Sequence, residues 1–512
     1  MEYEFISEAL NINNVITVIV LLLCALCIAC IRPVYLYWKF LNEIHKIPGP
    51  YLHPLWGSLD RYPPNEKGLQ NAYNYILHDP DSKLILTRLG PFKYFIIFSF
   101  PEEISNLLCM KSTLLPKDDY IYGTLRPYLG DGLLISNFYK WQTRRKMLTP
   151  GFHYEILNPY VLLYNEIVEV FIRKCEEKME NGAVIIPIFE SITLLTLDVM
   201  LQCVCSYKSD CQIGNEEDKY VNAIKANAEL TNKQITTLLY HCRPIFYLSP
   251  HGFAWRKNNR IVKEQSMKVV QSRRKFVLEN PKLFETRRSK DFIDIILTSK
   301  DKTGKALTDE GIVEEMTTFL FAGHDTTASA ISWTLHLLGL HQKYQIMCRE
   351  EVREVLKDRK SEQLLCEDLP KLTFLTMCIK ESMRLYPPVY AIYRKANDDI
   401  HLERYFIPKG TSLVISIGNL HTNPHIWENP LEYNPMRFDC ELPGGHPFSF
   451  LTFSAGHRNC IGQKFAFNEL LVSIGRIINK FDIESLSKEP KRVSVIILKP
   501  EEDLNIRFRL AE

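Results

Sequence analysis

The chain has 512 residues, of which 46% are hydrophobic and 24% charged, so it can bury a large core and shows no bias toward disorder. Its formal net charge of +2 lacks the basic surplus that nucleic-acid binding requires, and we expect no nucleic-acid partner. The interior of the sequence contains no stretch rich in Gly, Ser or Pro of the kind that links two domains. These features predict one large catalytic unit.

The amino-terminal segment is apolar enough to span a membrane. Residues 9–31 carry no charge, and a bilayer core needs about 20 apolar residues. Acidic residues precede this segment and basic residues follow it, which favours a cytosolic location for the rest of the chain. We predict a single transmembrane helix at about 9–31, within an anchor and linker of residues 1–46. A secretory signal peptide is the alternative, but a basic start and a small-residue cleavage site are missing.

The catalytic unit is expected to cover residues 47–512. It begins with Ile47-Pro-Gly-Pro50, where two prolines prevent a helix from continuing. Such a stiff turn would set the angle between the catalytic unit and the membrane. An ordinary linker is the alternative.

The body of the chain is predominantly helical in pattern. Two β-rich runs within 83–98, divided by Gly90-Pro91, predict a hairpin. Helical spacing follows over 139–148, 159–179, 188–204, 220–229, 257–279 and 309–341. Further strand-like runs occupy 391–392, 412–415 and 494–498. We predict a mainly α fold with a smaller β region, an α+β arrangement in which the two regions are segregated.

The motif FSAGHRNCIG, residues 453–462, surrounds one cysteine with an aromatic residue, an arginine and two glycines. Gly456 permits a backbone conformation closed to residues with a Cβ, and Gly462 permits a close approach. Cys460 precedes a helical run, so partial positive charge and backbone N–H groups would favour its thiolate. For Cys460 alone, a buried structural cysteine would be the simpler interpretation.

This motif resembles the cysteine-ligand loop of cytochromes P450. The resemblance implies a cytochrome P450 fold, bound heme b (iron protoporphyrin IX) and Cys460 as the axial ligand of the iron. It also implies that Phe453 shields the sulfur and that Arg458 pairs with a heme propionate.

Glu381 and Arg384 are three residues apart, which places them on one face of a helix. Such pairs are common on exposed surfaces, so this pattern alone is weak. The flanking residues are apolar, however, and Pro-Met-Arg437-Phe follows downstream. The order resembles the Glu-x-x-Arg and Pro-x-Arg-Phe motifs of the same family, which implies a buried triad of Glu381, Arg384 and Arg437.

The segment AGHDTT, residues 322–327, lies midway along the helix predicted over 309–341. A glycine and two threonines weaken a helix interior, and a threonine hydroxyl can bond a carbonyl one turn back. We predict a local distortion that makes room for dioxygen. Asp325 and Thr326 resemble the acid and alcohol that relay protons to dioxygen in the family. A capping or surface Asp-Thr pair is the alternative.

Further residues, most of them basic, match positions that surround the heme in the family. Trp141 and Arg145 resemble a Trp-x-x-x-Arg pair that binds a propionate, and Arg394 is a further candidate, although a rim salt bridge would also explain it. A predicted basic patch for an acidic reductase comprises Lys140, Arg144, Lys146 and Lys464. A solvated charged face is its alternative.

Within the family, the chain resembles the microsomal branch that contains fatty-acid ω-hydroxylases and many arthropod enzymes. Many members of that branch carry a glutamate where this chain has Ala322, and that carboxylate can esterify a heme methyl. Because alanine cannot, we predict heme that is not covalently attached. Candidate pocket residues by family position are Phe319, Leu320, Val389, Ile392 and Ile496.

The implied function is a heme-thiolate monooxygenase, which inserts one oxygen atom from O2, its co-substrate, into an apolar fatty acid, terpenoid, steroid or xenobiotic. No dinucleotide fingerprint is present, so electrons would come from NADPH-cytochrome P450 reductase, with cytochrome b5 as a further candidate partner. The implied location is the endoplasmic reticulum membrane. A non-oxygenating isomerase or dehydratase and a heme-based sensor are the alternatives, and NADPH consumption would separate the three.

Overall fold

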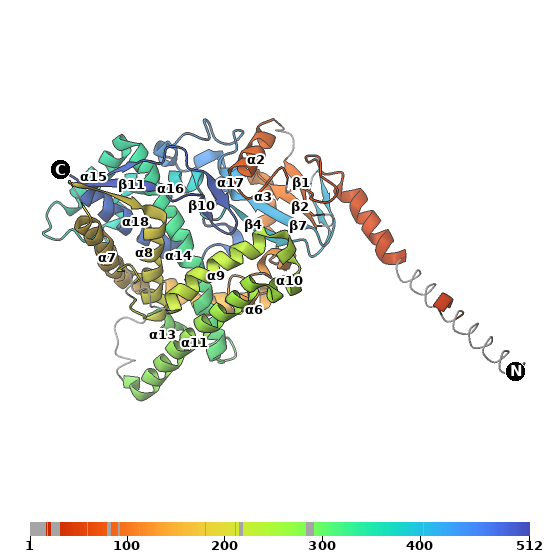
Figure 1. Cartoon of the computed structure of the whole chain (residues 1–512), viewed down its shortest axis with the longest axis horizontal. Helices are drawn as coiled ribbons and strands as arrows, with labels where there is room; N and C mark the ends of the chain where they lie inside the picture. Colours follow the sequence, from red (N-terminus) through yellow and green to blue (C-terminus); the bar gives the residue numbers. More distant parts are fainter. Residues whose placement is uncertain are drawn as a thin grey trace, which may run out of the picture.

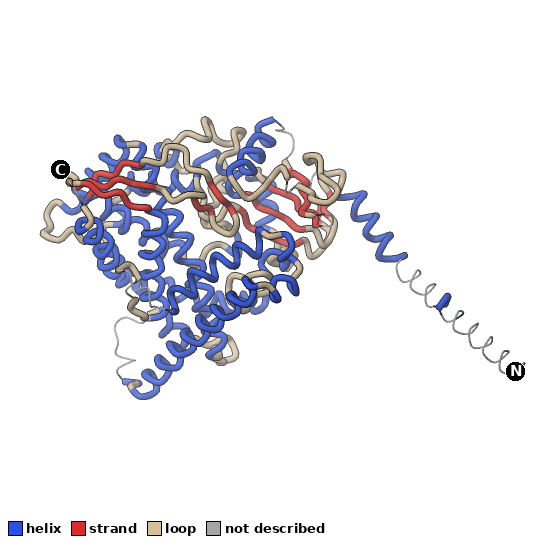
Figure 2. The backbone as a smooth tube through the Cα atoms, viewed as in Figure 1, coloured by secondary structure: helices blue, strands red, loops and turns tan. Residues whose placement is uncertain are grey.

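The computed structural model describes residues 17, 19–21, 31–58, 60–78, 83–90, 93–111, 113–179, 181–209, 211–213, 219–282, 291–402 and 404–512. Helices make up most of the body, and the strands gather along one side of it (Figures 1 and 2). The predicted α+β class, with a helical region and a smaller β region, is confirmed.

Each helix predicted in the body of the chain is present, with bounds that differ by up to seven residues. The longer helices are α2 (Glu66–His78), α3 (Pro101–Cys109), α6 (Phe138–Leu148), α7 (Tyr154–Glu177), α8 (Ile188–Cys205), α9 (Lys219–Thr236), α11 (Pro250–Glu279), α14 (Asp309–Leu340), α15 (Gln342–Leu356), α16 (Thr373–Leu385) and α18 (Gln463–Lys480). Shorter ones are α4 (Asp119–Tyr122), α5 (Arg126–Leu129), α10 (Arg243–Leu248), α13 (Phe292–Thr298) and α17 (Ile417–His421).

Local side-chain chemistry determines where several of these helices begin. Asn137 caps α6 by accepting a hydrogen bond from the Lys140 N–H, and Thr308 caps α14 in the same way through Gly311. α11 begins at Ser249-Pro250, where the serine caps and the proline needs no hydrogen-bond partner for its nitrogen.

The largest sheet has the order β1-β2-β7-β4, formed by β1 (Leu84–Leu89), β2 (Lys93–Phe98), β7 (Ser412–Ser416) and β4 (Ala391–Lys395). β1 and β2 form the predicted antiparallel hairpin. β2 then pairs in parallel with β7, which lies more than three hundred residues further along the chain. Gly49 packs against this sheet so closely that an added Cβ would lie 2.3 Å from the Leu86 carbonyl oxygen. The Ile47–Pro50 turn is therefore fixed to the β region.

Three smaller sheets complete the β structure. Their pairings are β3-β11-β8, β10-β9 and β5-β6. The strands are β3 (Ala183–Pro187), β5 (Ile400–His401), β6 (Phe406–Ile407), β8 (Phe481–Ser485), β9 (Arg492–Ser494), β10 (Leu498–Pro500) and β11 (Asn505–Leu510). The single strand predicted over 494–498 is wrong, because residues 495–497 form the turn between β9 and β10.

α14 is the central helix of the body (Figure 1), and it packs against α8, α11, α16, α18 and β8. At about 1.5 Å per residue, its 32 residues extend for ~48 Å. Nearly all of its side chains from Ile312 onward are buried, apart from a short run around Ala322–Thr326. That run is where the cavity described below lies.

Most of the predicted transmembrane segment, about 9–31, lies outside the described residues. Residues 31–44 form a helix that extends from the body (red in Figure 1) and carries exposed apolar side chains such as Val34 and Trp38. Among the described residues, one helix is long and apolar enough to cross a membrane, namely α8, and 67% of it is buried inside the body. Such burial is typical of a core helix.

Candidate functional site

The predicted cysteine loop faces an interior cavity of about 330 Å³. α14 forms one wall of this cavity, the cysteine loop and the start of α18 another, and the β4 region a third. Most of the predicted site residues meet here, including Trp141, Arg145, Ala322, Thr326, Arg394, Phe453, Arg458 and Cys460. Segments separated by more than three hundred residues in the sequence are thus brought to one place.

The loop around Cys460 has the backbone geometry that its glycine predicted. Gly456 has φ +70°, and an added Cβ would lie 2.7 Å from the Leu108 carbonyl oxygen. The Cys460 N–H donates to the Phe453 carbonyl at 2.9 Å, which closes the loop. Gly462 has an ordinary negative φ, and an added Cβ there would meet only ordinary contacts with protein. The need for glycine is therefore evident at position 456.

Cys460 is accessible from the cavity and lies three residues before α18 begins. Protein packed around the residue raises the pKa of its thiol by burial, while the Gly462 N–H and the nearby Arg145 act in the opposite direction. The backbone and the arginine thus favour the thiolate as expected, but burial outweighs them in the protein alone.

Four cationic side chains line the cavity: Lys117, Arg145, Arg394 and Arg458. No aspartate or glutamate lines it in the part of the chain that the structure describes. Burial, together with Arg394 and Arg458, holds the pKa of Lys117 well below its usual value. The cations therefore repel one another, and an anion placed among them would be stabilised.

Arg458 shows that this cluster suits a bound anion. One of its terminal nitrogens donates to the Ser136 carbonyl at 3.0 Å, whereas the other, Nη1, is buried without a hydrogen-bond partner. Its guanidinium lies over the Trp141 ring, 4.4 Å from the centroid. An unpartnered buried donor beside other cations fits the two propionates of heme, with the Cys460 sulfur available to the iron. The residues present therefore fit heme b.

The sequence did not identify Lys117 as a residue of the site. It precedes α4, and its ammonium lies 4.4 Å from the centroid of the Tyr122 ring. Lys117 also pairs with Arg394 through an isolated β-bridge, and this pairing brings the two cations to the same side of the cavity. No local pattern around residue 117 could have identified it, because the pairing joins residues far apart in the chain.

On α14 the two predicted relay residues differ in their placement. Thr326 lines the cavity and donates to the Ala322 carbonyl at 2.7 Å, the bond predicted one turn back. Asp325 is not among the residues that line the cavity, and its carboxylate lies 3.2 Å from Nε2 of His324. The predicted distortion does not interrupt α14, which is α-helical throughout its length.

Four of the five candidate pocket residues line the cavity, namely Phe319, Val389, Ile392 and Ile496. Leu320 does not, because the helical twist turns it into the core, where it is 1% exposed. Its prediction as a pocket residue is therefore wrong. Phe319, which lines the cavity, also packs against the rings of Phe152 and Phe292.

The three residues of the predicted triad meet, but Arg437 is partly exposed, with 13% of its side chain accessible. Glu381 accepts from Nε and Nη2 of Arg384 at 2.7 and 2.8 Å, and Arg437 Nε lies 3.3 Å from the same carboxylate. Both Glu381 and Arg384 are 0% exposed. The remaining guanidinium donors of Arg384 bind the carbonyls of His421, Pro430 and Glu432. The pair thus ties α16 to the irregular segment that leads to the cysteine loop.

The predicted basic patch is only partly a surface feature. Arg144 is buried and bonds Oε1 of Glu315 at 2.8 Å, so its inclusion in the patch is wrong. Lys140 forms ion pairs with Asp131 and Glu314. Lys146 and Lys464 are exposed. The sequence could not separate these roles, because α6 presents one face to α14 and another to solvent.

Comparisons with known proteins agree with this site. A family model described as Cytochrome P450 matches residues 47–507. "Cytochrome P450 4F4" of Rattus norvegicus is 39% identical over 92% of this chain and 91% of its own length. The "Ultra-long-chain fatty acid omega-hydroxylase" of Homo sapiens is 39% identical over 88% of this chain and 85% of its own length. A solved cytochrome P450DA heme domain shares the fold, with a TM-score of 0.79, 23% identity and coverage of 91% and 98% of the two chains.

The family match extends over most of the chain and includes the loop, the central helix and the triad that form and support the cavity. Relatives that align over 80–91% of their own length carry the same family name. The chain therefore belongs to the cytochrome P450 family and is a heme-dependent monooxygenase that uses dioxygen.

Proposed function

We propose that this monooxygenase hydroxylates long-chain fatty acids near the end distant from the carboxylate. The observation that carries the proposal is the cavity itself, in which apolar residues such as Val389 and Ile496 surround the approach to Cys460. A long apolar chain would gain about 25 cal/mol for each Å² of surface that it buries there. The relative named as an ultra-long-chain fatty acid ω-hydroxylase supports the same substrate class.

Heme supplies the activation of dioxygen, and we assign the protein groups around it as follows. Cys460 would bind the heme iron through its sulfur, Phe453 would shield that sulfur, and Gly456 and Gly462 shape the loop. Trp141, Arg145, Arg394, Arg458 and Lys117 would hold the propionates, because these residues line the cavity. Ala322 lines the cavity and has no carboxylate through which heme could be attached covalently.

Thr326 would hold a proton donor in the cavity, because this residue lines the cavity and its hydroxyl can accept a hydrogen bond while it donates to the Ala322 carbonyl. Asp325 exchanges protons with Thr326 from outside the wall, and its contact with His324 orients its carboxylate. The substrate, for its part, contacts Phe319, Val389, Ile392 and Ile496.

We further propose a location on the endoplasmic reticulum membrane, with residues 1–46 as the anchor and linker and residues 47–512 in the cytosol. Exposed apolar side chains on the helix of residues 31–44 and on α10 support this orientation. NADPH-cytochrome P450 reductase would supply the electrons, with cytochrome b5 as a second donor. Lys146 and Lys464 remain the exposed basic residues of the predicted docking patch.

The test is to reconstitute the full chain with the reductase, NADPH and hexadecanoic acid, and to identify the products by mass spectrometry. A red-shifted Soret band of the reduced carbon monoxide complex should accompany hydroxylated acid. Turnover of peroxides without NADPH would indicate an isomerase or dehydratase. A Soret band without any turnover would indicate a sensor, and either result would overturn the proposal.

A further inference from the structure

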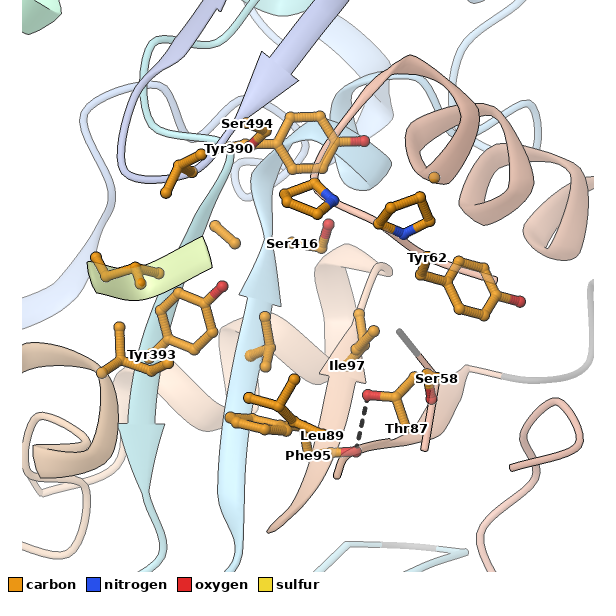
Figure 3. Close-up of a pocket in the computed structure, with 18 of the residues that line it drawn as sticks. Ser58, Tyr62, Thr87, Leu89, Phe95, Ile97, Tyr390, Tyr393, Ser416 and Ser494 are labelled. Atoms are coloured by element: carbon orange, nitrogen blue, oxygen red, sulfur yellow. Dashed lines mark hydrogen bonds between the residues drawn. The ribbon is translucent and has the colours of Figure 1, made fainter. Parts of the chain in front are cut away.

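A second cavity, of about 420 Å³, lies beside the cysteine cavity. It is bounded by the β1-β2-β7-β4 sheet, by α2 and by the segment from α9 to α10. Figure 3 shows Tyr390, Tyr393, Phe95 and Ile97 around it. Its lining is mostly apolar, with aromatic rings on several sides. This volume can therefore accept an apolar chain.

The two cavities share a boundary. Six residues line both of them: Ile121, Ile235, Ala391, Tyr393, Val495 and Ile496. Residues that line both volumes separate them, so the cavities are no more than one layer of side chains apart. Rotamer changes in side chains such as Ile235 and Ile496 would connect them. A chain lying in the second cavity can thus reach the cavity at Cys460.

The charged groups of the second cavity are all basic. Arg88 and Arg243 line it, and no aspartate or glutamate does so in the described part of the chain. Arg88 is already committed, because its guanidinium donates to the His53 carbonyl at 2.7 Å and to the Tyr94 hydroxyl at 3.2 Å. Arg243 has no hydrogen bond or ion pair among the described residues, and it is exposed. Its guanidinium is therefore available to a ligand.

The position of Arg243 is set by contacts around it. It begins α10, and its Nη2 lies beside Gly123 at the end of α4, 2.8 Å from where a Cβ would be. Next to it, Tyr120 of α4 is bonded at 3.0 Å to Nδ1 of His241, whose Nε2 bonds the Ile235 carbonyl at 2.7 Å. A carbonyl can only accept, so Nε2 of His241 donates this bond. Both ring nitrogens of His241 are thus engaged within the protein, whereas the Arg243 guanidinium is available at this rim.

Exposed apolar side chains lie close in sequence to residues that line this cavity. Ile245 and Leu248 of α10 are 45% and 76% exposed, and Trp56, two residues before the lining residue Ser58, is 50% exposed. An arginine among exposed apolar residues suits a ligand with one charged end and a long apolar body. The rim would bind the charged end while the cavity accepts the body.

We propose that Arg243 binds the carboxylate of the substrate, and that the second cavity holds its acyl chain so that the far end enters the cavity at Cys460. This inference rests on the proposed function and deepens it, because it names the group that selects for an acid. A carboxylate held at the rim leaves the distal carbons nearest the sulfur. The oxidised carbon is then the one whose distance along the chain from the carboxylate at Arg243 matches the path to the cavity at Cys460.

The test compares Arg243→Met and Arg243→Lys with Arg260→Met, which removes an exposed charge from α11 outside both cavities. Full-length holoprotein is titrated with dodecanoic, hexadecanoic and icosanoic acids and with the corresponding primary alcohols, and the spin-state change of the heme spectrum reports binding. For Arg243→Met, affinity for the acids should fall about tenfold or more, as expected for a lost charge-assisted hydrogen bond, while affinity for the alcohols changes less than about twofold. The affinity of Arg243→Lys for the acids should lie between those of the wild type and Arg243→Met. Arg260→Met should bind acids and alcohols as the wild type does.

If Arg243→Met loses equal affinity for acids and alcohols, or keeps its affinity for the acids, Arg243 does not bind the carboxylate. Either result would leave fatty-acid hydroxylation intact if the wild type still binds and oxidises the acids. If the wild type binds none of the acids, the proposed substrate class fails and the anchor fails with it. Product analysis with hexadecanoic acid adds a second readout, because loss of the anchor should spread hydroxylation over a wider range of carbons.

Discussion

Arg145 donates hydrogen bonds to both the backbone carbonyl and the side-chain carbonyl of Asn459, the residue that precedes Cys460. The two distances are 2.8 and 2.9 Å. α6 therefore holds the cysteine loop directly, besides contributing Trp141 and Arg145 to the cavity wall. The sequence suggested only the second of these roles.

Replacing Arg145 should loosen the loop that presents the sulfur. In Arg145→Met both bonds to Asn459 are lost, at a cost of roughly 1.5–3 kcal/mol for each charge-assisted bond. We expect a lower heme content and an unstable red-shifted Soret band in the carbon monoxide complex. Lys146→Met, an exposed residue on the same helix, is the control and should behave as the wild type. Full heme content and a stable band in Arg145→Met would contradict this prediction.

Glu381→Ala should yield protein without bound heme. Glu381 is fully buried and bonds both Arg384 and Arg437, so its removal leaves two guanidinium groups without their anion. Breaking a buried ionic network in this way costs roughly 3–5 kcal/mol. Heme per polypeptide, measured on purified protein, checks the prediction. Glu354→Ala, which removes an exposed partner of Lys357, should retain normal heme, and a normal value in Glu381→Ala would refute the structural role of the triad.

Much of the fold could be predicted because many of its helices are long and have one clearly apolar face, as α7 and α18 do, while α8 and α14 are long apolar segments. The turn at residues 495–497 was missed because its Val-Ile-Ile sequence is typical of a strand, whereas tertiary contacts impose the reversal. The family resemblance identified the loop and the triad because their residues are close in sequence or occur in a fixed order.

What the sequence could not reveal depends on which way a side chain points in three dimensions. Leu320 and Phe319 are adjacent, yet only Phe319 faces the cavity. Arg144 and Arg145 are adjacent, yet the first turns to Glu315 on α14 and the second to the cysteine loop. Lys117 reaches the cavity through its pairing with Arg394, which no local pattern indicates.

Thr326→Ala should separate oxygen chemistry from heme binding. Thr326 lines the cavity, so we expect normal carbon monoxide binding but a smaller yield of product for each NADPH consumed. Thr334→Ala is a matched control on the same helix, since Thr334 makes the same bond one turn back, at 2.7 Å, and does not line the cavity. The ratio of product to NADPH decides the result. Unchanged coupling in Thr326→Ala would count against the proton-relay assignment.

Heme should be extractable from the wild-type protein with acid and organic solvent. Ala322 lies on the cavity wall and has no carboxylate with which to esterify the porphyrin. After turnover, the denatured chain is separated by chromatography and its heme absorbance is measured. Ala322→Glu provides the contrasting variant, in which a fraction of the heme should stay with the polypeptide, and Ala322→Gln should not retain it. Heme that remains on the denatured wild-type chain would prove the prediction wrong.

Glu315 should make the stability of the protein depend on pH near neutrality. It is fully buried on α14, and burial raises its pKa to about 7, although Arg144 and the Leu133 N–H act in the opposite direction. Its usual value is 4.5, so folding takes up a proton between these two values. The stabilisation linked to this proton is therefore fully present below about pH 4.5 and is lost as the pH rises to about 7.

Glu315→Gln removes the titration while retaining a group that can accept from Leu133 or Arg144. The melting temperature of the wild type, relative to this variant, should fall as the pH is raised from about 5 to about 7 and then level off. Glu310→Gln, an exposed substitution in the first turn of α14, should follow the wild type at every pH. Scanning calorimetry at fixed ionic strength provides the measurement. A constant difference between wild type and Glu315→Gln across this range would show that the carboxylate keeps its charge in the folded protein, with Arg144 fully compensating for its burial.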